Sequence, residues 1–237
     1  MKKLTKDTKV VALTGAGISA ESGIRTFRES GGLWENHRIE DIATWNGFVK
    51  DPLKVWQFYR ERWQQSLQVQ PNPAHIALLE LEEYLHDNFS LITQNVDGLH
   101  TRAGSKHVLE MHGSLGTCFC TECRSRYYMA DIPLGQLIPI CSKCGAKLRP
   151  NIVWFGEIPH YLFEIENKLK TCDVFIIIGT SGVVYPAAGF VMTAKLMGAH
   201  TIAVNLDVPE NMSFIDEYYA GKSGTILPPL IRTWISE

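Results

Sequence analysis

The chain has 237 residues, of which 45% are hydrophobic and 20% are charged, and its net charge is −2. These values predict one large folded domain, or one domain with an insertion, and they exclude a disordered chain. The charge argues against nonspecific nucleic-acid binding, and no apolar run is long enough to cross a membrane. The basic first residues are not followed by an apolar stretch, so a secretory signal is not expected. Thiols held in close pairs suit metal binding in a reducing compartment, so we expect a cytoplasmic protein.

Apolar, β-branched runs recur along the chain and predict strands. They are Lys9–Leu13, Ser90–Thr93, His107–Glu110, Asn151–Trp154, Asp173–Ile178 and His200–Asn205. The later runs are continuous rather than alternating, which is typical of strands covered on both faces. Helical patterns lie between several runs, and two of them, Pro73–Leu85 and Pro186–Met197, open with proline at a first-turn position. This alternation predicts an α/β fold with a mostly parallel sheet.

Two stretches interrupt the alternation of strands and helices. Residues 29–70 are aromatic and helical without a clear strand, and residues 116–149 contain cysteines and short polar turns. We expect them to form a smaller lobe, helical in the first stretch and zinc-binding in the second. The larger lobe would then consist of residues 1–28, 71–115 and 150–237, within a single domain of residues 1–237.

A glycine-rich turn, G-x-G-x-x-A, follows the first predicted strand at Gly15–Ala20. Glycines let a backbone approach a pyrophosphate, and a helix start supplies N–H donors, although an ordinary strand-to-helix turn has the same pattern. The acidic strand end that nicotinamide dehydrogenases carry about 20 residues later is missing, which disfavours hydride transfer. A ribose site could instead lie at Gly179–Ser181 and Asn205–Asp207, after two later strands.

Polar side chains also follow the two middle strands. Gln94, Asn95 and Asp97 come after one of them, where they could form either a common Asn/Asp turn or a ligand site. His112 follows the next strand. A lone histidine is more often structural, but a neutral imidazole at this sheet edge could accept a proton from a sugar hydroxyl near neutral pH.

Four cysteines have the spacing of a zinc site: Cys120-x2-Cys123-x17-Cys141-x2-Cys144. Because sulfur fills all four positions, we predict a closed, structural zinc ion rather than a catalytic one. Cys118 overlaps the first pair and could compete as a ligand. Cys172 is interpreted as an inert, buried thiol.

Taken together, the motifs resemble the sirtuins, which are NAD-dependent protein-lysine deacylases. The matching segments run in family order from residue 9 to about residue 230: Gly15–Arg28, Thr93–Asp97, His112–Gly113, the four cysteines, Val153–Glu157, Gly179–Ser181 and Asn205–Asp207. The resemblance implies a Rossmann-like lobe for NAD, a small zinc and helical lobe, and an active site between them.

The resemblance also implies a role for individual residues. His112 matches the base that activates a ribose hydroxyl, and the products would be nicotinamide, free lysine and O-acyl-ADP-ribose. An acylated-lysine protein or peptide would bind as an extended strand along Val153, Phe155, Gly156 and Val184. The positions that match NAD-binding residues are Gly15, Ala16, Gly17, Ser19, Ala20, Phe27, Arg28, Trp34, Gln94, Asn95, Asp97, Gly179, Thr180, Ser181, Asn205, Leu206, Asp207 and Ser223.

One departure from the common sirtuin pattern concerns the acyl group. Thr26 stands where many sirtuins have aspartate, and this change accompanies a subgroup with a Tyr-x-x-Arg pair in the acyl pocket. Tyr59 and Arg62 match that pair and share a helix face, which implies deacetylase and desuccinylase activity. Without the resemblance, a core tyrosine beside a solvated arginine would be the simpler interpretation.

Two other functions remain open at the level of sequence. Mono-ADP-ribosyl transfer would use the same cofactor, and a zinc module without catalytic activity would bind a partner chain. The presence of Asn95, Asp97 and His112 counts against the second. Neither a membrane nor a nucleic acid is expected as a partner.

Overall fold

The computed structural model describes residues 3–25, 33–34 and 37–236. Six strands form the main sheet in the order β11-β10-β9-β1-β4-β5, and every neighbouring pair is parallel. The sheet confirms the predicted α/β fold. Its strands are β1 (Val10–Thr14), β4 (Phe89–Thr93), β5 (Val108–Glu110), β9 (Val174–Ile178), β10 (His200–Asn205) and β11 (Glu217–Ala220).

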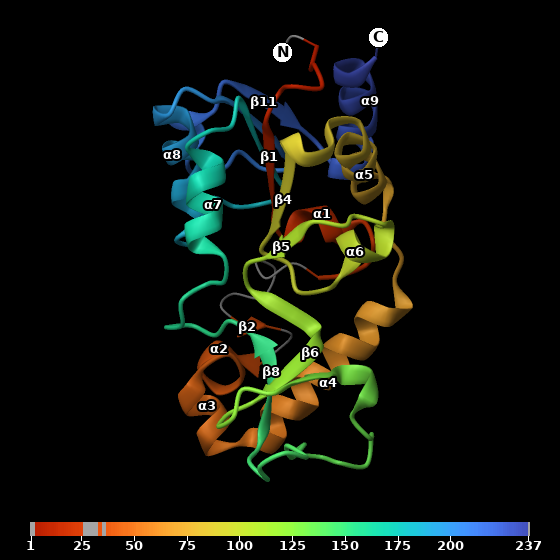
Figure 1. Cartoon of the computed structure of the whole chain (residues 1–237), viewed down its shortest axis with the longest axis vertical. Helices are drawn as coiled ribbons and strands as arrows, with labels where there is room; N and C mark the ends of the chain where they lie inside the picture. The colour runs from red at the N-terminus through yellow and green to blue at the C-terminus, as the bar shows by residue number, and fades with distance from the viewer. Residues whose placement is uncertain (1–2, 26–32, 35–36, 237) are drawn as a thin grey trace.

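Helices cover both faces of this sheet (Figure 1). One face packs against α1 (Ala16–Ala20), α5 (Pro73–Leu85) and α9 (Ser223–Ile235), and the other against α7 (Leu162–Leu169) and α8 (Phe190–Leu196). Successive residues of β1 and β9 alternate between the two apolar clusters. This double coverage explains why their sequences are continuously apolar.

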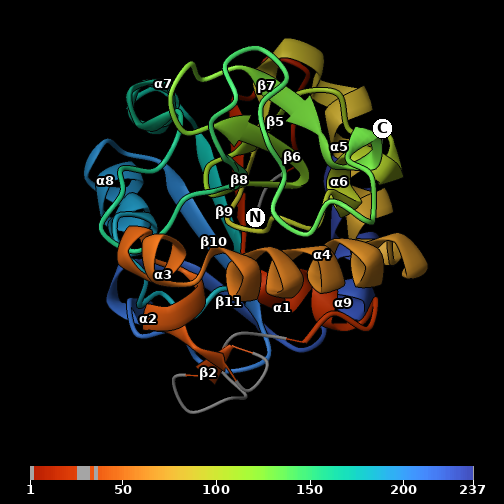
Figure 2. The same cartoon turned by 90° about the horizontal axis from the view of Figure 1, so that it is seen from below.

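The smaller lobe is built on a three-stranded antiparallel sheet, ordered β7-β6-β8. Figure 1 shows helices α2 to α4 beside this sheet and away from the main one, and Figure 2 shows α4 along one side of β6 and β8. Its elements are β2 (Leu33–Trp34), β3 (His37–Arg38), α2 (Ile39–Ile42), α3 (Trp45–Lys50), α4 (Pro52–Gln68), β6 (Gly113–Cys120), β7 (Arg126–Tyr128) and β8 (Leu148–Ile152). The remaining elements are α6 (Leu99–Ala103) and the 3-10 turns His86–Asn88, Met129–Asp131, Ala187–Gly189 and Met212–Phe214.

Several elements differ from the sequence-based expectations. The strand expected at Asn151–Trp154 lies at Leu148–Ile152. It pairs with the antiparallel strand β6 of the small sheet, a partner that is distant in sequence and that a local pattern does not reveal. The helix expected from Pro186 becomes α-helical only at Phe190, after a 3-10 turn. Strands β6 and β11 were not expected. Glycines interrupt β6, and β11 is a half-buried edge strand, so neither has a strong apolar pattern.

Arginine side chains fasten helix α4 to its surroundings. The Arg60 guanidinium donates to the carbonyl oxygens of Leu134 (2.8 Å) and Gln136 (2.5 Å) in the cysteine-containing stretch. The Arg102 guanidinium donates to the Ser66 and Val69 carbonyls at the end of α4, at 2.6 Å each. Unsatisfied carbonyls at a helix end are good acceptors for a cation, as at the Arg102 contacts. Together, the Arg60 and Arg102 contacts fix the orientation of α4.

A buried pair of histidines lies under the glycine-rich turn. The rings of His75 on α5 and His100 on α6 have their centroids 4.8 Å apart. The Asn72 backbone N–H donates to His75 Nδ1, completing a capping box, and His100 Nε2 lies 2.9 Å from Thr14 Oγ1. Burial lowers the pKa of His75 to about 4 and that of His100 to about 3. Both rings are therefore neutral at pH 7.

These pKa values predict a loss of stability in acid. Because the pKa of folded His75 lies below its unfolded value of 6.5, the unfolded state binds the proton more tightly. The contribution of His75 is complete above pH 6.5 and decreases as the pH falls toward 4. In His75→Gln, a glutamine at the same capping-box position does not titrate. Between pH 7 and pH 4, we expect wild type to lose more of its free energy of unfolding than the variant. The difference between the two losses should be up to about 3 kcal/mol.

Urea unfolding at both pH values measures this difference. His107→Gln is the matched control, because it makes the same substitution at an exposed histidine outside the His75–His100 pair. Equal losses in His75→Gln and wild type would contradict the prediction.

Candidate active site and metal centre

The glycine-rich turn lies at the point where the order of the main sheet reverses. Strand β1 has β9 on one side and β4 on the other, so the loops after these three strands meet at one edge. Gly17 N–H donates to Gly179 O at 2.8 Å, and a Cβ on Gly17 would lie 2.7 Å from Gly179 Cα. Gly179 has φ +61°, and a Cβ there would approach Ile18 N to 2.4 Å. Glycine is therefore required in both loops, and open α/β sheets bind ligands at such an edge.

The predicted residues Ser19, Asn95 and Asp97 form one hydrogen-bonded group. Asn95 Nδ2 donates to Gly15 O (3.0 Å) and lies 3.1 Å from Ser19 Oγ, which donates to Asp97 Oδ2 at 2.8 Å. The Leu99 backbone N–H donates to the other Asp97 oxygen at 2.9 Å. Burial raises the pKa of Asp97. The structure thus brings together side chains that the sequence places about 80 residues apart.

A second group joins the loops after β4, β9 and β10. Gln94 Nε2 donates to Thr180 Oγ1 at 3.1 Å, and Asn205 Nδ2 donates to the Thr180 carbonyl at 3.0 Å and to that of Asp207 at 2.8 Å. Gly221 N–H donates to the Asn205 carbonyl, which brings the start of α9 beside this group. The polar groups extend along four strand ends, an arrangement that fits a dinucleotide.

The other expected cofactor residues lie as follows. Ala16 and Ala20 are on α1, the Ser181 carbonyl accepts from Glu210 N–H, and Leu206 is exposed. Ser223 is the buried first residue of α9. Phe27, Arg28 and the side chain of Trp34 lie outside the described residues.

His112 sits beside the Gln94–Asp97 segment. Its Nδ1 lies 3.1 Å from the Gln94 carbonyl oxygen, which can only accept, so Nδ1 carries the hydrogen and Nε2 carries the lone pair. Burial lowers the pKa of His112, and His160 lowers it further, while the bond to Gln94 acts in the opposite direction. The ring is therefore neutral at pH 7, as a general base must be.

The expected substrate edge is held by an ion pair that sequence reasoning missed. Glu157 accepts two hydrogen bonds from the Arg149 guanidinium, at 2.6 and 3.0 Å, and one from the Trp154 backbone N–H at 2.8 Å. These contacts fix the loop containing Val153, Phe155 and Gly156. Val184, on the other expected edge, and Phe155 are both exposed. The sequence gives no signal of this pairing, because the burial of Arg149 appears only in the structure.

Tyr59 and Arg62 both lie on α4. Tyr59 is fully buried, and its hydroxyl accepts a hydrogen bond from Trp154 Nε1 at 3.0 Å. The Arg62 side chain is only 17% exposed, and its guanidinium carbon lies 5.1 Å from the Phe58 ring centroid. Its Nε atom is buried and has no hydrogen-bond partner within the described part of the chain. Arg62 is therefore not a solvated surface residue.

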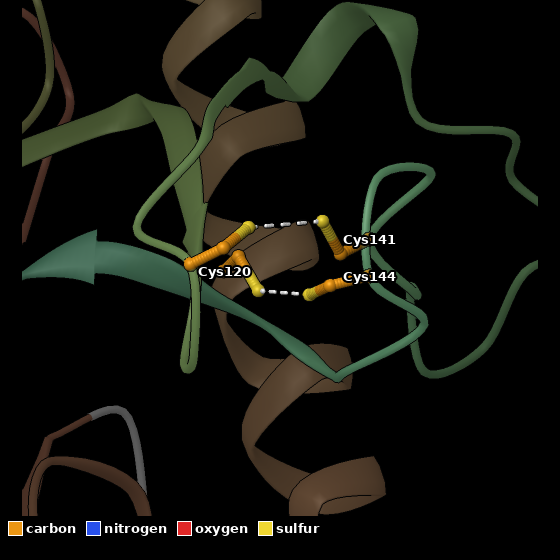
Figure 3. A group of neighbouring side chains, drawn as sticks. Cys120, Cys141 and Cys144 are labelled. Carbon is orange, nitrogen blue, oxygen red and sulfur yellow. Dashed lines mark hydrogen bonds between the residues drawn. The ribbon is translucent and has the colours of Figure 1, made fainter.

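The four zinc-type cysteines converge in the smaller lobe. Their sulfur atoms all lie within 4.8 Å of one another, with 3.4 Å between Cys120 and Cys144 and 3.6 Å between Cys123 and Cys141. Figure 3 shows Cys141 and Cys144 pointing toward Cys120. A tetrahedral zinc ion with Zn–S bonds of about 2.3 Å requires sulfurs about 3.8 Å apart, so the four thiols fit a structural zinc ion.

The remaining cysteines are separate from this group. Cys118 is fully buried in the apolar cluster of the smaller lobe, and burial raises the pKa of its thiol to about 12. Cys172 is also buried, in the main lobe, and burial raises its thiol pKa to about 11. The structure therefore separates Cys118 from the metal cluster, a choice that spacing alone had left open.

No helix in the described part of the chain meets the length and hydropathy required of a membrane span.

Comparisons with known proteins agree with this geometry. A protein of Pasteurella multocida named "NAD-dependent protein deacylase" is 50% identical over 235 residues, covering 98% of this chain and all of that protein. A solved Sir2 homologue in complex with NAD matches with a TM-score of 0.87 and 42% identity, covering 97% of this chain and 90% of the other. A structure described as Sir2 bound to acetylated peptide has a TM-score of 0.83 and 32% identity, covering 94% and 92%. Residues 15–186 match the model of the Sir2 family. The chain therefore belongs to the Sir2 family, the sirtuins.

Proposed function

We propose that this chain is an NAD-dependent protein-lysine deacylase that removes acetyl and succinyl groups. The observation that carries the proposal is the neutral, half-buried imidazole of His112, bonded to the loop that also contains Asn95 and Asp97. Its support comes from relatives named as deacylases at about half identity over nearly the whole chain.

Each part of the site has a task in this reaction. NAD would supply the electrophilic ribose carbon and nicotinamide as leaving group. The backbone of Gly15, Gly17 and Gly179 would lie against its phosphates, and Asn95 and Asp97 would orient the nicotinamide half. His112 Nε2 would take the proton of a ribose hydroxyl, while Nδ1–H remains bonded to the Gln94 carbonyl. The products would be nicotinamide, free lysine and O-acyl-ADP-ribose.

The acylated lysine would enter between two exposed edges. Val153, Phe155 and Gly156 form one edge, which Glu157 and Arg149 brace, and Val184 belongs to the other. An extended peptide could add to these edges through its main chain, whose hydrogen bonds would supply affinity that does not depend on the side chains. The solved relative described as bound to acetylated peptide supports this class of substrate.

Mass spectrometry of acetyl-lysine and succinyl-lysine peptides, incubated with and without NAD, tests the proposal. We expect free lysine and O-acyl-ADP-ribose only when NAD is present. ADP-ribosylated protein without free lysine would instead identify mono-ADP-ribosyl transfer. A protein that leaves both peptides unchanged in the presence of NAD would contradict deacylation.

The acyl specificity of the proposal rests on Arg62. Its guanidinium is largely buried on the helix face that carries Tyr59, and one of its Nη atoms lies 3.6 Å from a carboxylate oxygen of the exposed Glu61. The buried Nε of Arg62 has no hydrogen-bond partner among the described residues. A buried donor without a partner is costly, and a carboxylate at the end of a succinyl chain would satisfy it. An acetyl group is too short to reach and would leave space for water beside the arginine.

Arg62→Met is therefore expected to lower kcat/KM for a succinyl peptide by about tenfold to a few hundredfold, because a hydrogen bond to a charged group contributes roughly 1.5–3 kcal/mol. The matching acetyl peptide should change far less. Parallel steady-state kinetics on the two peptides measures the difference. Arg38→Met, which removes an exposed arginine of the same lobe, is the control and should affect neither peptide. Equal losses on both peptides in Arg62→Met would rule out the charged acyl pocket and leave deacylation in place.

A further inference from the structure

The two cysteine pairs of the metal centre share an unusual backbone conformation. The residue directly after each pair lies in the left-handed region, with φ +59° at Arg124 and +76° at Gly145. Glycine adopts this conformation readily, whereas a residue with a side chain does so at a cost in free energy. The second pair thus has the residue that the turn favours, and the first has an arginine in a strained conformation. Such strain often marks a functional side chain.

The Arg124 side chain lies in the wall of a cavity. This cavity has a volume of about 620 Å³ and lies between the smaller lobe and the loop after β8. The guanidinium carbon of Arg124 is 5.3 Å from the Phe119 ring centroid, and that of Arg149 is 5.1 Å from the same ring. Asn151 and His160 also line the cavity. An aromatic ring flanked by guanidinium groups is a surface suited to binding a charged partner.

Charge in this cavity is unevenly compensated. Arg149 is committed to Glu157, which accepts two of its hydrogen bonds. Arg124 is close enough to Glu157 to lower its pKa, but in the described part of the chain it has no hydrogen bond or ion pair with Glu157 or with Glu122, the other acid in the wall. The wall contains two guanidinium groups and two carboxylates, so its charges balance in number. Arg124 is the guanidinium group of the wall that is left without a hydrogen bond to a carboxylate of the described residues, and it can bind a further carboxylate there.

The cavity adjoins the edge along which the acylated peptide would bind. Val153 and Gly156 belong to that edge and also line the cavity. We propose that Arg124 binds an acidic side chain of the acylated protein, a few residues from the modified lysine, and so selects substrates with acidic flanks. The inference rests on the proposed deacylase function. An extended strand advances about 3.3 Å per residue and alternates its side chains, so only one or two positions on one side should reach Arg124.

The test uses acetyl-lysine peptides in which a single glutamate or glutamine is placed at each of four positions on either side of the lysine. We expect wild type to prefer glutamate over glutamine about two- to fivefold in kcat/KM at one or two positions on one side. Arg124 is exposed, so the preference should shrink as the salt concentration rises. Arg124→Gly should abolish the preference and leave turnover of the glutamine peptides unchanged. Arg124→Lys should retain part of it.

Misfolding cannot produce this pattern, because glycine suits the backbone at position 124. We expect Arg124→Gly to have a Tm equal to or above that of wild type. Equal turnover of glutamate and glutamine peptides at every position would overturn the assignment of Arg124, as would a preference that persists in Arg124→Gly. If wild type leaves every peptide acylated, the proposed deacylase function itself fails, so the two failures are distinct.

Discussion

Replacing His112 with tyrosine is expected to lower deacylation by about a hundredfold to ten-thousandfold, the usual contribution of a general base. Nε2 carries the lone pair because Nδ1–H is bonded to the Gln94 carbonyl, and a phenol in that position cannot accept a proton near neutral pH. His112→Gln, which is closer in size and can still donate to Gln94, should show a comparable loss. Both variants should bind NAD and should keep the circular dichroism spectrum of wild type.

His107→Tyr is the matched control for this experiment. His107 immediately precedes β5, is exposed and lies away from the loops that meet at Gly15. Its replacement should leave turnover unchanged. A folded His112→Tyr protein with the turnover of wild type would remove His112 from the reaction.

Cys120→Ala is expected to lose its zinc and to unfold at a markedly lower temperature, because metal binding and local folding are coupled at a four-thiolate site. Three of the four sulfurs would remain, which is one fewer than a closed tetrahedral site requires. Activity should fall only as a consequence of the disordered lobe. Elemental analysis of the purified protein, combined with thermal unfolding, measures both effects.

Cys118→Ala provides the control for the loss of a sulfur in the same strand. Cys118 lies two residues before Cys120 in β6 but is buried in the apolar cluster, separate from the metal cluster. This variant should keep one zinc ion per chain and lose only modest stability from the small cavity. Zinc lost from Cys118→Ala and kept by Cys120→Ala would reverse the assignment of ligands.

The sequence alone was informative wherever a signal is local. The apolar runs gave most strands of the main sheet, because a strand covered on both faces must be apolar throughout. The helix Pro73–Leu85 was predicted with the bounds that the structure gives it, because Pro73 marks its first turn. The structure adds Asn72 as its cap. The spacing of the cysteine pairs likewise indicated a metal site before any geometry was known.

The sequence by itself determined the parallel α/β fold, the glycine turn and the four cysteines that form one cluster, since short-range patterns encode each of them. Only the tertiary structure decided which groups meet: Arg149 pairs with Glu157, Asn95 reaches Gly15, and Cys118 packs into the core rather than joining the cluster. It also decided that Arg62 is largely buried and that Nδ1 of His112 carries the hydrogen. Burial and long-range hydrogen bonds set these properties, and both depend on residues that are far apart along the chain.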